Sequence, residues 1–367
     1  MSALPEVGIG IVGYGLMGRA HAYGWRTAAH VRELPCVPRL RVMSGREEDA
    51  LRRAASLYGV EEVTTDWRAL IERPDVQIVD VCTPPGTHPE IVEAAAAAGK
   101  AVLCEKPLAA DLASATAAVA AVERAGVPNA IGFNYRRLPA LSLMKELVDE
   151  GRVGRILLWR ATWLSDEFLD PEIPFDWRFE RRLGATTIAD LGSHLIDLAL
   201  WMVGEIAEVA AQSETFTRER AGGTVDVDEA SSALVRFAGG ARGAFEMART
   251  CARRPCDFWV EVNGTEGTLR FDYPRLNELW LGEAGDDERL YGMRLIRAEQ
   301  PSHPYAADWW PPGQGVGDGP SVVNQAADHL ERWPGGPWEP NLASGLRAQA
   351  VCDAMERAAA EKRWVSL

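Results

Sequence analysis

Short apolar runs alternate with amphipathic helical segments in the first third of the chain. The run from Gln77 to Cys82 is nearly continuously apolar, as expected for a strand that helices cover on both faces of a sheet. The predicted strands are Val7–Val12, Leu40–Met43, Ile78–Cys82, Ala101–Cys104 and Ala130–Phe133. Strands that alternate with helices predict an α/β domain with a doubly wound parallel sheet over residues 1–133.

The pattern changes beyond Arg136, where longer runs alternate between apolar and polar positions. These runs predict strands at Ile156–Thr162, Ser231–Phe237, Ala241–Glu246, Phe258–Val262 and Thr268–Phe271. One helix is predicted over Leu191–Val203, and the Pro- and Gly-rich stretch Trp309–Gly317 is predicted to be a loop. We therefore expect residues 134–367 to form a second, α+β domain with a large, mostly antiparallel sheet.

Charge and cysteine content narrow the class of partner. The 367 residues carry a net charge of −14, which argues against nucleic acid and anionic membranes as partners. Six scattered cysteines, with Cys82 and Cys104 in predicted strands, indicate reduced thiols and a cytoplasmic protein. The chain shows neither a basic leader nor an apolar run near the roughly 20 residues of a membrane span. We expect a small-molecule partner.

A glycine turn directly follows the first predicted strand and opens a helix. Gly13 allows the tight turn, Gly15 lets the backbone approach a pyrophosphate, and Gly18 lets the helix pack on the strand. Leu16 and Met17 complete the turn. The context predicts a dinucleotide site, although a purely structural glycine turn would have the same pattern.

The second predicted strand ends differently from that of most NAD-binding domains. An acidic residue normally accepts the ribose hydroxyls of NAD there. This chain instead has Ser44, Gly45 and Arg46, which suit a 2′-phosphate and favour NADP at least as much as NAD. Glu47 or Glu48 could still reach the ribose, and Arg46 could be a solvated loop residue.

Two further turns follow strands at the carboxyl edge of the predicted sheet, where open α/β sheets bind ligands. Thr83 and Pro84 form one turn, and Glu105 and Lys106 form the other. An oxidised nicotinamide ring and partial desolvation would favour the neutral form of Lys106, which could then accept a proton from a hydroxyl group. An ordinary surface lysine is the alternative. His88, a possible helix cap, and Asn134 complete the candidate cofactor contacts.

Asp190, His194 and Asp197 are spaced to share one face of the predicted helix. An imidazole between carboxylates suits acid/base work on a hydroxyl group. Two other interpretations stay open, a zinc site that uses Asp190 and His194 and a hydrogen-bonded structural histidine.

Aromatic and cationic side chains near the second sheet suit a sugar. Tyr135, Trp163 and Arg178 are the candidates, although aromatic residues on a sheet are more often part of a core. His21 and the remaining histidines have no comparable neighbours in the sequence.

Taken together, the motifs resemble the glucose–fructose oxidoreductase, inositol dehydrogenase and rhizopine-catabolism family, abbreviated Gfo/Idh/MocA, over nearly the full length. The matching segments are Gly13–Gly18, Ala98–Leu108, Asp190–Asp197, Gly264–Gly267 and Gly345–Arg347. Three further segments, Gly132–Arg137, Trp177–Phe179 and Trp310–Gly313, resemble the levoglucosan dehydrogenase-like sugar dehydrogenases.

The resemblance implies a Rossmann domain followed by an open-faced sheet domain that binds substrate and often forms a homodimer or homotetramer. It implies Lys106 at the reacting hydroxyl, His194 as acid/base and Asp190 as the partner of substrate or histidine. The chain departs from the pattern at Ser44, where an acidic residue is common, and at Gln314, where related sugar dehydrogenases tend to have histidine.

The sequence therefore predicts an NAD(P)-dependent dehydrogenase acting on a secondary ring hydroxyl of a sugar, sugar derivative or cyclitol. A non-catalytic protein that senses NAD(P), and a metal-assisted enzyme using Asp190 and His194, are the alternatives.

Overall fold

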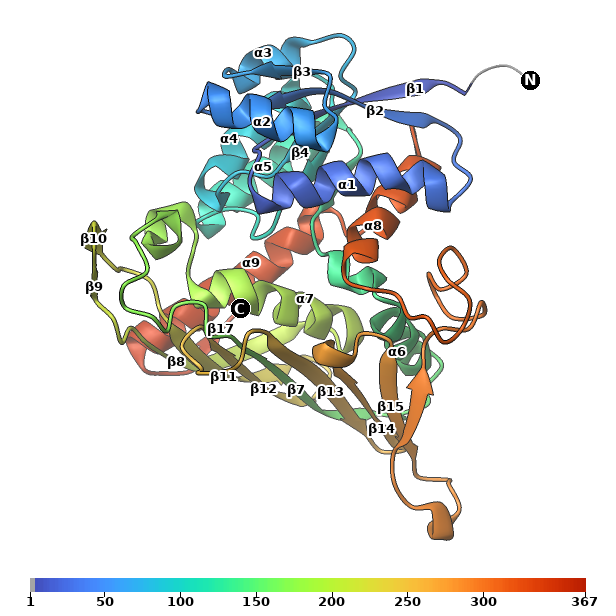
Figure 1. Cartoon of the computed structure of the whole chain (residues 1–367). Helices are drawn as coiled ribbons and strands as arrows, with labels where there is room; N and C mark the ends of the chain where they lie inside the picture. Colours follow the sequence, from blue (N-terminus) through green and yellow to red (C-terminus); the bar gives the residue numbers. More distant parts are fainter. Residues whose placement is uncertain (1–3) are drawn as a thin grey trace. The chain divides into compact units, whose positions relative to one another are not determined.

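The computed structural model describes residues 4–367, which divide into two units (Figure 1). The first unit extends to Asn134 and also includes Asp318–Leu346, and the second comprises Tyr135–Gly317 and Arg347–Leu367. The sequence pattern placed residues 318–346 with the second domain. They group with the first because helix α8, Gly319–Glu331, packs on helix α1, Leu16–Val31.

Close packing of α1 and α8 depends on a glycine. A Cβ at Gly24 of α1 would lie 2.8 Å from the carbonyl oxygen of Val322, so a larger residue would push α8 away. Ala326 and Leu330 of α8 share one buried apolar cluster with Trp25 of α1. The first unit therefore needs a segment more than 180 residues further along the chain to complete its core.

The first unit contains a six-stranded sheet in the order β3-β2-β1-β4-β5-β6, with every pair parallel. Its strands are β1 Glu6–Val12, β2 Val37–Ser44, β3 Glu62–Thr64, β4 Ile78–Val81, β5 Ala101–Cys104 and β6 Asn129–Ile131. The remaining helices of this unit are α2 Glu48–Tyr58, α3 Trp67–Glu72, α4 His88–Ala97 and α5 Leu112–Ala125. The predicted doubly wound parallel sheet is confirmed. The pattern missed β3, because three half-exposed residues have no apolar run.

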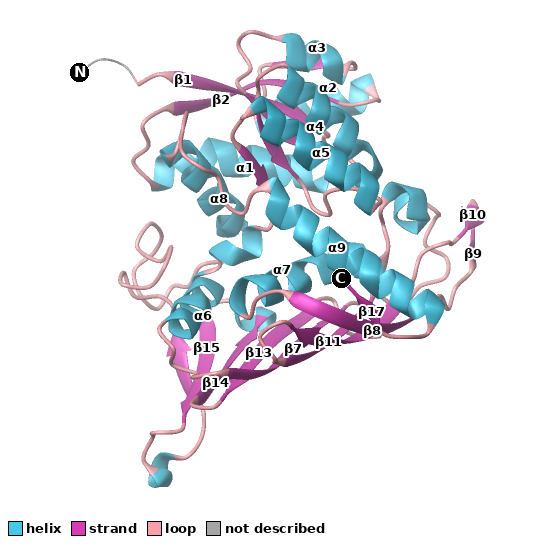
Figure 2. Ribbon diagram, turned by 180° about the vertical axis from the view of Figure 1, so that it is seen from behind, coloured by secondary structure: helices cyan, strands magenta, loops and turns pink. Residues whose placement is uncertain are grey.

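The second unit contains a nine-stranded sheet in the order β16-β15-β14-β13-β7-β12-β11-β8-β17 (Figure 2). Only β12 and β7 run parallel, so the predicted, mostly antiparallel sheet is confirmed. Its strands are β7 Ile156–Leu164, β8 Ile206–Glu214, β11 Ala230–Phe237, β12 Arg242–Ala248, β13 Asp257–Gly264, β14 Gly267–Asp272, β15 Glu278–Glu283, β16 Arg294–Arg297 and β17 Val365–Ser366.

Helices α6, Pro139–Asp149, and α7, Ser193–Met202, lie on one face of this sheet (Figure 2). Helix α6 contacts β14 and β15, and α7 contacts β7. The small hairpin β9, Glu219–Arg220, with β10, Gly223–Thr224, forms a separate sheet, and helix α9 covers Leu342–Glu361. Within residues 4–367, no helix is both long and apolar enough to cross a membrane.

Candidate active site

The glycine turn of the first unit is shaped by close backbone contacts. Gly13 has φ +110°, and a Cβ there would lie 2.5 Å from the carbonyl oxygen of Cys82. A Cβ at Gly18 would lie 2.2 Å from the carbonyl oxygen of Gly13. At Gly15, by contrast, a Cβ would meet no atom within 4 Å. The turn is therefore tight on its inner side and open at Gly15.

The open side of the turn coincides with the start of α1. Gly15 is the N-cap of the helix and offers no side chain to bind its first amide groups, and Leu16 is largely exposed. Met17 follows in the same helical turn. Free amide groups and the positive end of the helix dipole suit a pyrophosphate. The residues therefore fit a dinucleotide cofactor, which Gly15 would admit where a side chain would block it.

Strand β2 ends at Ser44, one of the residues predicted to suit a 2′-phosphate. Ser44 is buried, and its carbonyl oxygen accepts a hydrogen bond from the amide of Gly13 at 2.8 Å. A Cβ at Gly45 would collide with the ring of Tyr14 at 2.2 Å. Arg46 and Glu47 are both exposed. The Arg46 cation is thus accessible to a ligand, as is the Glu47 carboxylate.

His88 connects the two turns that follow β4 and β5. Its Nε2 lies 2.7 Å from the carbonyl oxygen of Thr83, and its Nδ1 lies 3.0 Å from that of Pro107. Burial lowers the pKa of the imidazole. The suggested cap is Thr87 rather than His88, which is the first residue of α4. His88 therefore ties together the segments that contain Pro84 and Lys106.

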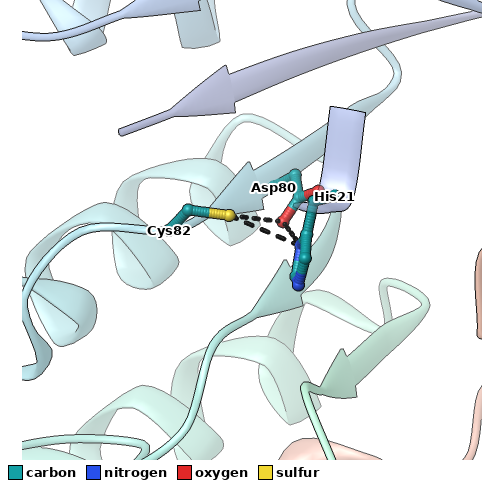
Figure 3. A group of neighbouring side chains, drawn as sticks. All are labelled: His21, Asp80 and Cys82. Carbon is teal, nitrogen blue, oxygen red and sulfur yellow. Dashed lines mark hydrogen bonds and ion pairs between the residues drawn. The ribbon is translucent and has the colours of Figure 1, made fainter. Parts of the chain in front are cut away.

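His21 has buried neighbours that the sequence did not indicate, among them Asp80 and Cys82 (Figure 3). Its Nδ1 is 2.8 Å from Asp80, and its Nε2 is 2.9 Å from Glu105. Burial lowers the pKa of His21, but the charge and hydrogen-bond interactions with Asp80 and Cys82 together outweigh it and raise the pKa well above its ordinary value. The expectation that His21 lacks significant neighbours is wrong, since residues 59 and 84 positions away fold against it.

Among residues 4–367, the group of His, Cys, Asp or Glu side chains close enough to share a metal ion is His21, Asp80 and Cys82. The nearest oxygen of Asp80 is 2.8 Å from the His21 nitrogen, a hydrogen-bond separation. Two nitrogen or oxygen ligands of tetrahedral zinc would stand about 3.3 Å apart. The group is better described as hydrogen-bonded than as a metal site, and it includes neither Asp190 nor His194.

Asn134, the last residue of the first segment, donates a hydrogen bond from Nδ2 to the hydroxyl of Ser321 at 2.7 Å. Both residues are buried. Ser321 belongs to α8. This helix, which the sequence pattern did not predict, therefore holds the side chain of Asn134, a predicted cofactor contact.

In the second unit, His194 belongs to an aromatic group. Its ring stacks on Tyr135 with centroids 4.5 Å apart, and the Trp163 ring is 5.6 Å away. Tyr135 also contacts Phe258 and Tyr273 at 5.4 and 5.5 Å. The structure thus brings together three predicted site residues, His194, Tyr135 and Trp163.

The two carboxylates near His194 each bind an arginine. Asp197 accepts two hydrogen bonds from Arg136, at 2.8 and 2.6 Å, and burial raises the pKa of Asp197 although Arg136 opposes this. Asp190 accepts a hydrogen bond from the fully buried Arg249. Each predicted carboxylate therefore has an arginine partner, and the role of Asp190 and Asp197 beside the His194 imidazole stays a prediction.

The helix that contains His194 begins later than the sequence pattern predicts. Residues Ile188–Gly192 form a π-helical turn, and α7 begins only at Ser193. Asp190 therefore lies outside the α-helix whose regular spacing was expected to align it with His194. Such turns are frequent at functional sites.

Arg178 lies in the short 3₁₀ helix Trp177–Phe179, one-third exposed. Its guanidinium group stacks on the Trp177 ring at 4.5 Å and pairs with Asp176 at 3.4 Å. The exposed side leaves it accessible to a ligand.

Within the predicted loop Trp309–Gly317, residues Gly313–Gly317 line a pocket of about 440 Å³ together with Pro274–Glu278, Arg297 and Glu299. The amide of Gly313 donates to Glu299 at 2.9 Å, and the amide of Val316 donates to Asn277 at 2.7 Å. Gln314 lines the pocket. The pocket begins one residue after Tyr273, which contacts the aromatic group of His194.

Two family models match the chain. Residues 7–133 match the oxidoreductase family with an NAD-binding Rossmann fold, and residues 141–270 match the GFO/IDH/MocA C-terminal domain. Together they cover both the parallel sheet and much of the second unit.

Individual relatives agree with these matches. Levoglucosan dehydrogenase of Pseudarthrobacter phenanthrenivorans is 35% identical, with 99% of each chain covered. Myo-inositol 2-dehydrogenase of Thermotoga maritima is 33% identical, covering 77% of this chain and 80% of its own. A solved levoglucosan dehydrogenase in complex with NADH has a TM-score of 0.96 at 36% identity, covering 98% of this chain and 99% of its own. The chain belongs to the Gfo/Idh/MocA family of oxidoreductases, and its relatives include sugar and inositol dehydrogenases.

Proposed function

We propose that the protein is an NAD(P)-dependent dehydrogenase that oxidises a secondary ring hydroxyl of a sugar, sugar derivative or cyclitol. One observation carries the proposal: the open glycine turn and Lys106 lie at the same edge of one sheet. The turn follows β1, Thr83 follows β4, and Lys106 follows β5, and these strands are neighbours. Ligands of such sheets bind at this edge.

The glycine turn, Thr83 and Pro84 would hold the dinucleotide. Bound NAD(P) would accept hydride at its nicotinamide ring. Lys106 binds the substrate hydroxyl and accepts its proton, and His194 serves as a second acid/base. Asp190, fixed by Arg249, orients substrate or imidazole. Tyr135, Trp163 and Arg178 supply aromatic surface and hydrogen-bond donors for the sugar.

Relatives support the substrate class. Levoglucosan dehydrogenase has been solved with NADH and levoglucosan, and also with L-sorbose. We propose an anhydrosugar, hexose or cyclitol substrate, with levoglucosan and myo-inositol as the first compounds to test.

NAD is the cofactor that we propose first, because levoglucosan dehydrogenase was solved with NADH at 36% identity. NADP is the second candidate, because β2 ends in Ser44 without a carboxylate and Arg46 is exposed. Fluorescence titration with NADH and NADPH tests this choice. Selective NADPH binding that Arg46→Ala abolishes would favour NADP, and selective NADH binding that this variant leaves unchanged would favour NAD.

Lys106→Met tests the proposed chemistry. We expect turnover of the sugar to fall about a hundredfold or more, because the proton acceptor is removed. The dissociation constant of the reduced cofactor should stay within about threefold. Retained turnover would contradict the role of Lys106. Cofactor binding by the wild-type protein without turnover of any sugar or cyclitol would favour the non-catalytic sensor.

We further propose a homodimer or homotetramer. Leu158 of β7 and Leu234 of β11 are 38% and 56% exposed, next to buried positions of the same strands. The molar mass in solution, and its decrease in Leu234→Lys, would test this assembly. A monomeric wild-type protein would contradict it.

A further inference from the structure

His21 is held between two buried carboxylates of the first unit. The side chains of His21, Asp80 and Glu105 are 1%, 0% and 5% exposed. Each ring nitrogen faces a carboxylate oxygen, so the imidazole satisfies both carboxylates only when both nitrogens are protonated. Two buried anions without this cation would be costly. His21 therefore links Asp80 to Glu105 as a shared donor.

The Asp80 end of this arrangement is fixed by further donors. Trp25 donates from Nε1 to Oδ2 of Asp80 at 2.6 Å, and Cys82 Sγ lies 3.4 Å from Oδ1 (Figure 3). Burial and the Asp80 charge raise the pKa of the Cys82 thiol, so it remains a neutral donor. Asp80 thus cannot rotate without losing several bonds.

Glu105 links His21 to Lys106 through its two carboxylate oxygens. Oε1 of Glu105 binds His21, and Oε2 accepts a hydrogen bond from the Lys106 amide at 3.1 Å. A Cβ at Gly132 would lie 2.4 Å from the same Oε1. Both the imidazole and the backbone at Gly132 therefore pack closely against the Glu105 carboxylate.

We propose that His21 is a positioning residue for Lys106: by holding Glu105 in place, it fixes the backbone from which the reactive amine extends. This inference rests on the proposed function, because only a lysine that reacts needs its backbone held in one position. Stability alone does not require the group, since apolar residues of similar volume often pack as stably as buried ions. A displacement near 1 Å at a reacting group can cost about a hundredfold in rate.

The first test displaces Glu105 without changing any charge. Gly132→Ala places a methyl group against the carboxylate, and Gly132 has no positive φ that would add backbone strain. We expect kcat to fall about tenfold or more, while KM and the dissociation constant of the reduced cofactor change less than about threefold. Gly335→Ala is the matched control, because a Cβ there meets no atom within 4 Å. A wild-type kcat in a folded Gly132→Ala protein would overturn the proposal.

The second test weakens the interaction between His21 and Asp80. Asp80→Asn keeps the shape of the side chain but removes its charge, and it replaces Gly132→Ala should that variant not fold. Nitrogen NMR of protein labelled at its six histidines reports the protonation of each ring. At pH 8 we expect two protons on His21 in the wild type and one in Asp80→Asn, with a parallel fall in kcat. His30→Gln, an exposed position on the same helix, should change neither. Loss of the His21 proton with unchanged kcat would overturn the proposal.

A third readout separates this inference from the proposed function. Absence of turnover in the wild type would contradict the function but not the positioning. Acetic anhydride would then report the environment of Lys106 relative to the exposed Lys362. We expect Gly132→Ala to change the ratio of their modification rates more than about twofold, and an unchanged ratio would overturn the positioning role.

Discussion

The two units bury their charges in different ways. In the first unit one histidine is shared by two carboxylates, Asp80 and Glu105. In the second unit two buried carboxylates each pair with an arginine, Glu229 with Arg220 and Asp197 with Arg136. Arginine keeps its charge at every accessible pH, whereas histidine does not. The charge of the arginine pairs is therefore permanent, whereas the charge of His21 can respond to pH.

The largest effect should follow from breaking the most buried pair of the second unit. Arg220 and Glu229 are both 0% exposed in their side chains, and Arg220 also donates to the carbonyl oxygens of Phe168 and Asp170. Arg220→Met leaves the Glu229 charge buried, so we expect the free energy of unfolding to fall by about 3–5 kcal/mol. Urea denaturation measures this change.

Arg218→Met is the matched control for that experiment. Arg218 is 74% exposed and pairs weakly with Glu214 at 3.4 Å. Its substitution should change stability by less than about 0.5 kcal/mol. Equal effects of the two variants would show that burial does not govern these pairs.

A smaller loss in the free energy of unfolding is expected when Asp190 loses its arginine partner. Arg249→Met removes the buried partner, but the Asp190 side chain is 26% exposed and can bind water instead. We expect a loss of about 1–3 kcal/mol by the same urea measurement. A loss above that of Arg220→Met would contradict the ranking by burial. Under the proposed function kcat should also fall, because Asp190 loses its orientation.

The smallest effect is a pH dependence confined to the first unit. The folded-state pKa of His21 is raised, so its contribution to stability is fully present below the unfolded pKa of about 6.5. The contribution decreases as the pH rises from there through the folded pKa. The stability difference between wild type and Asp80→Asn should therefore shrink as the pH increases above about 6.5. A difference that stays constant from pH 6 to 9 would contradict a charged His21.

Local motifs in the sequence predicted much of this molecule. Gly13 and Gly18 are required by contacts within a few residues or with the adjacent strand, and their spacing together with Gly15 indicates the turn. The strands β7, β11, β12, β13 and β14 were predicted because each alternates buried and exposed residues or carries an apolar run. The family resemblance, confirmed by the matches, supplied the order of the two domains.

Long-range contacts were not predictable from local patterns. His21 meets Glu105 across 84 residues, and α8 returns to α1 after nearly 300. The π-helical turn before α7 also escaped notice, because the spacing of Asp190 and His194 fits a regular helix. Each case depends on which elements become neighbours, and this is set by the assembled sheet rather than by any single segment.

Hydride transfer itself provides the most direct test of the proposed function. Levoglucosan, myo-inositol and other sugars deuterated at the carbinol carbon would be incubated with the purified protein and the oxidised cofactor. Mass spectrometry of the nicotinamide would then follow the label. We predict that at least one such compound transfers deuterium to the ring with the wild-type protein and that Lys106→Met transfers almost none. Cofactor binding without transfer from any of these compounds would contradict a sugar or cyclitol dehydrogenase.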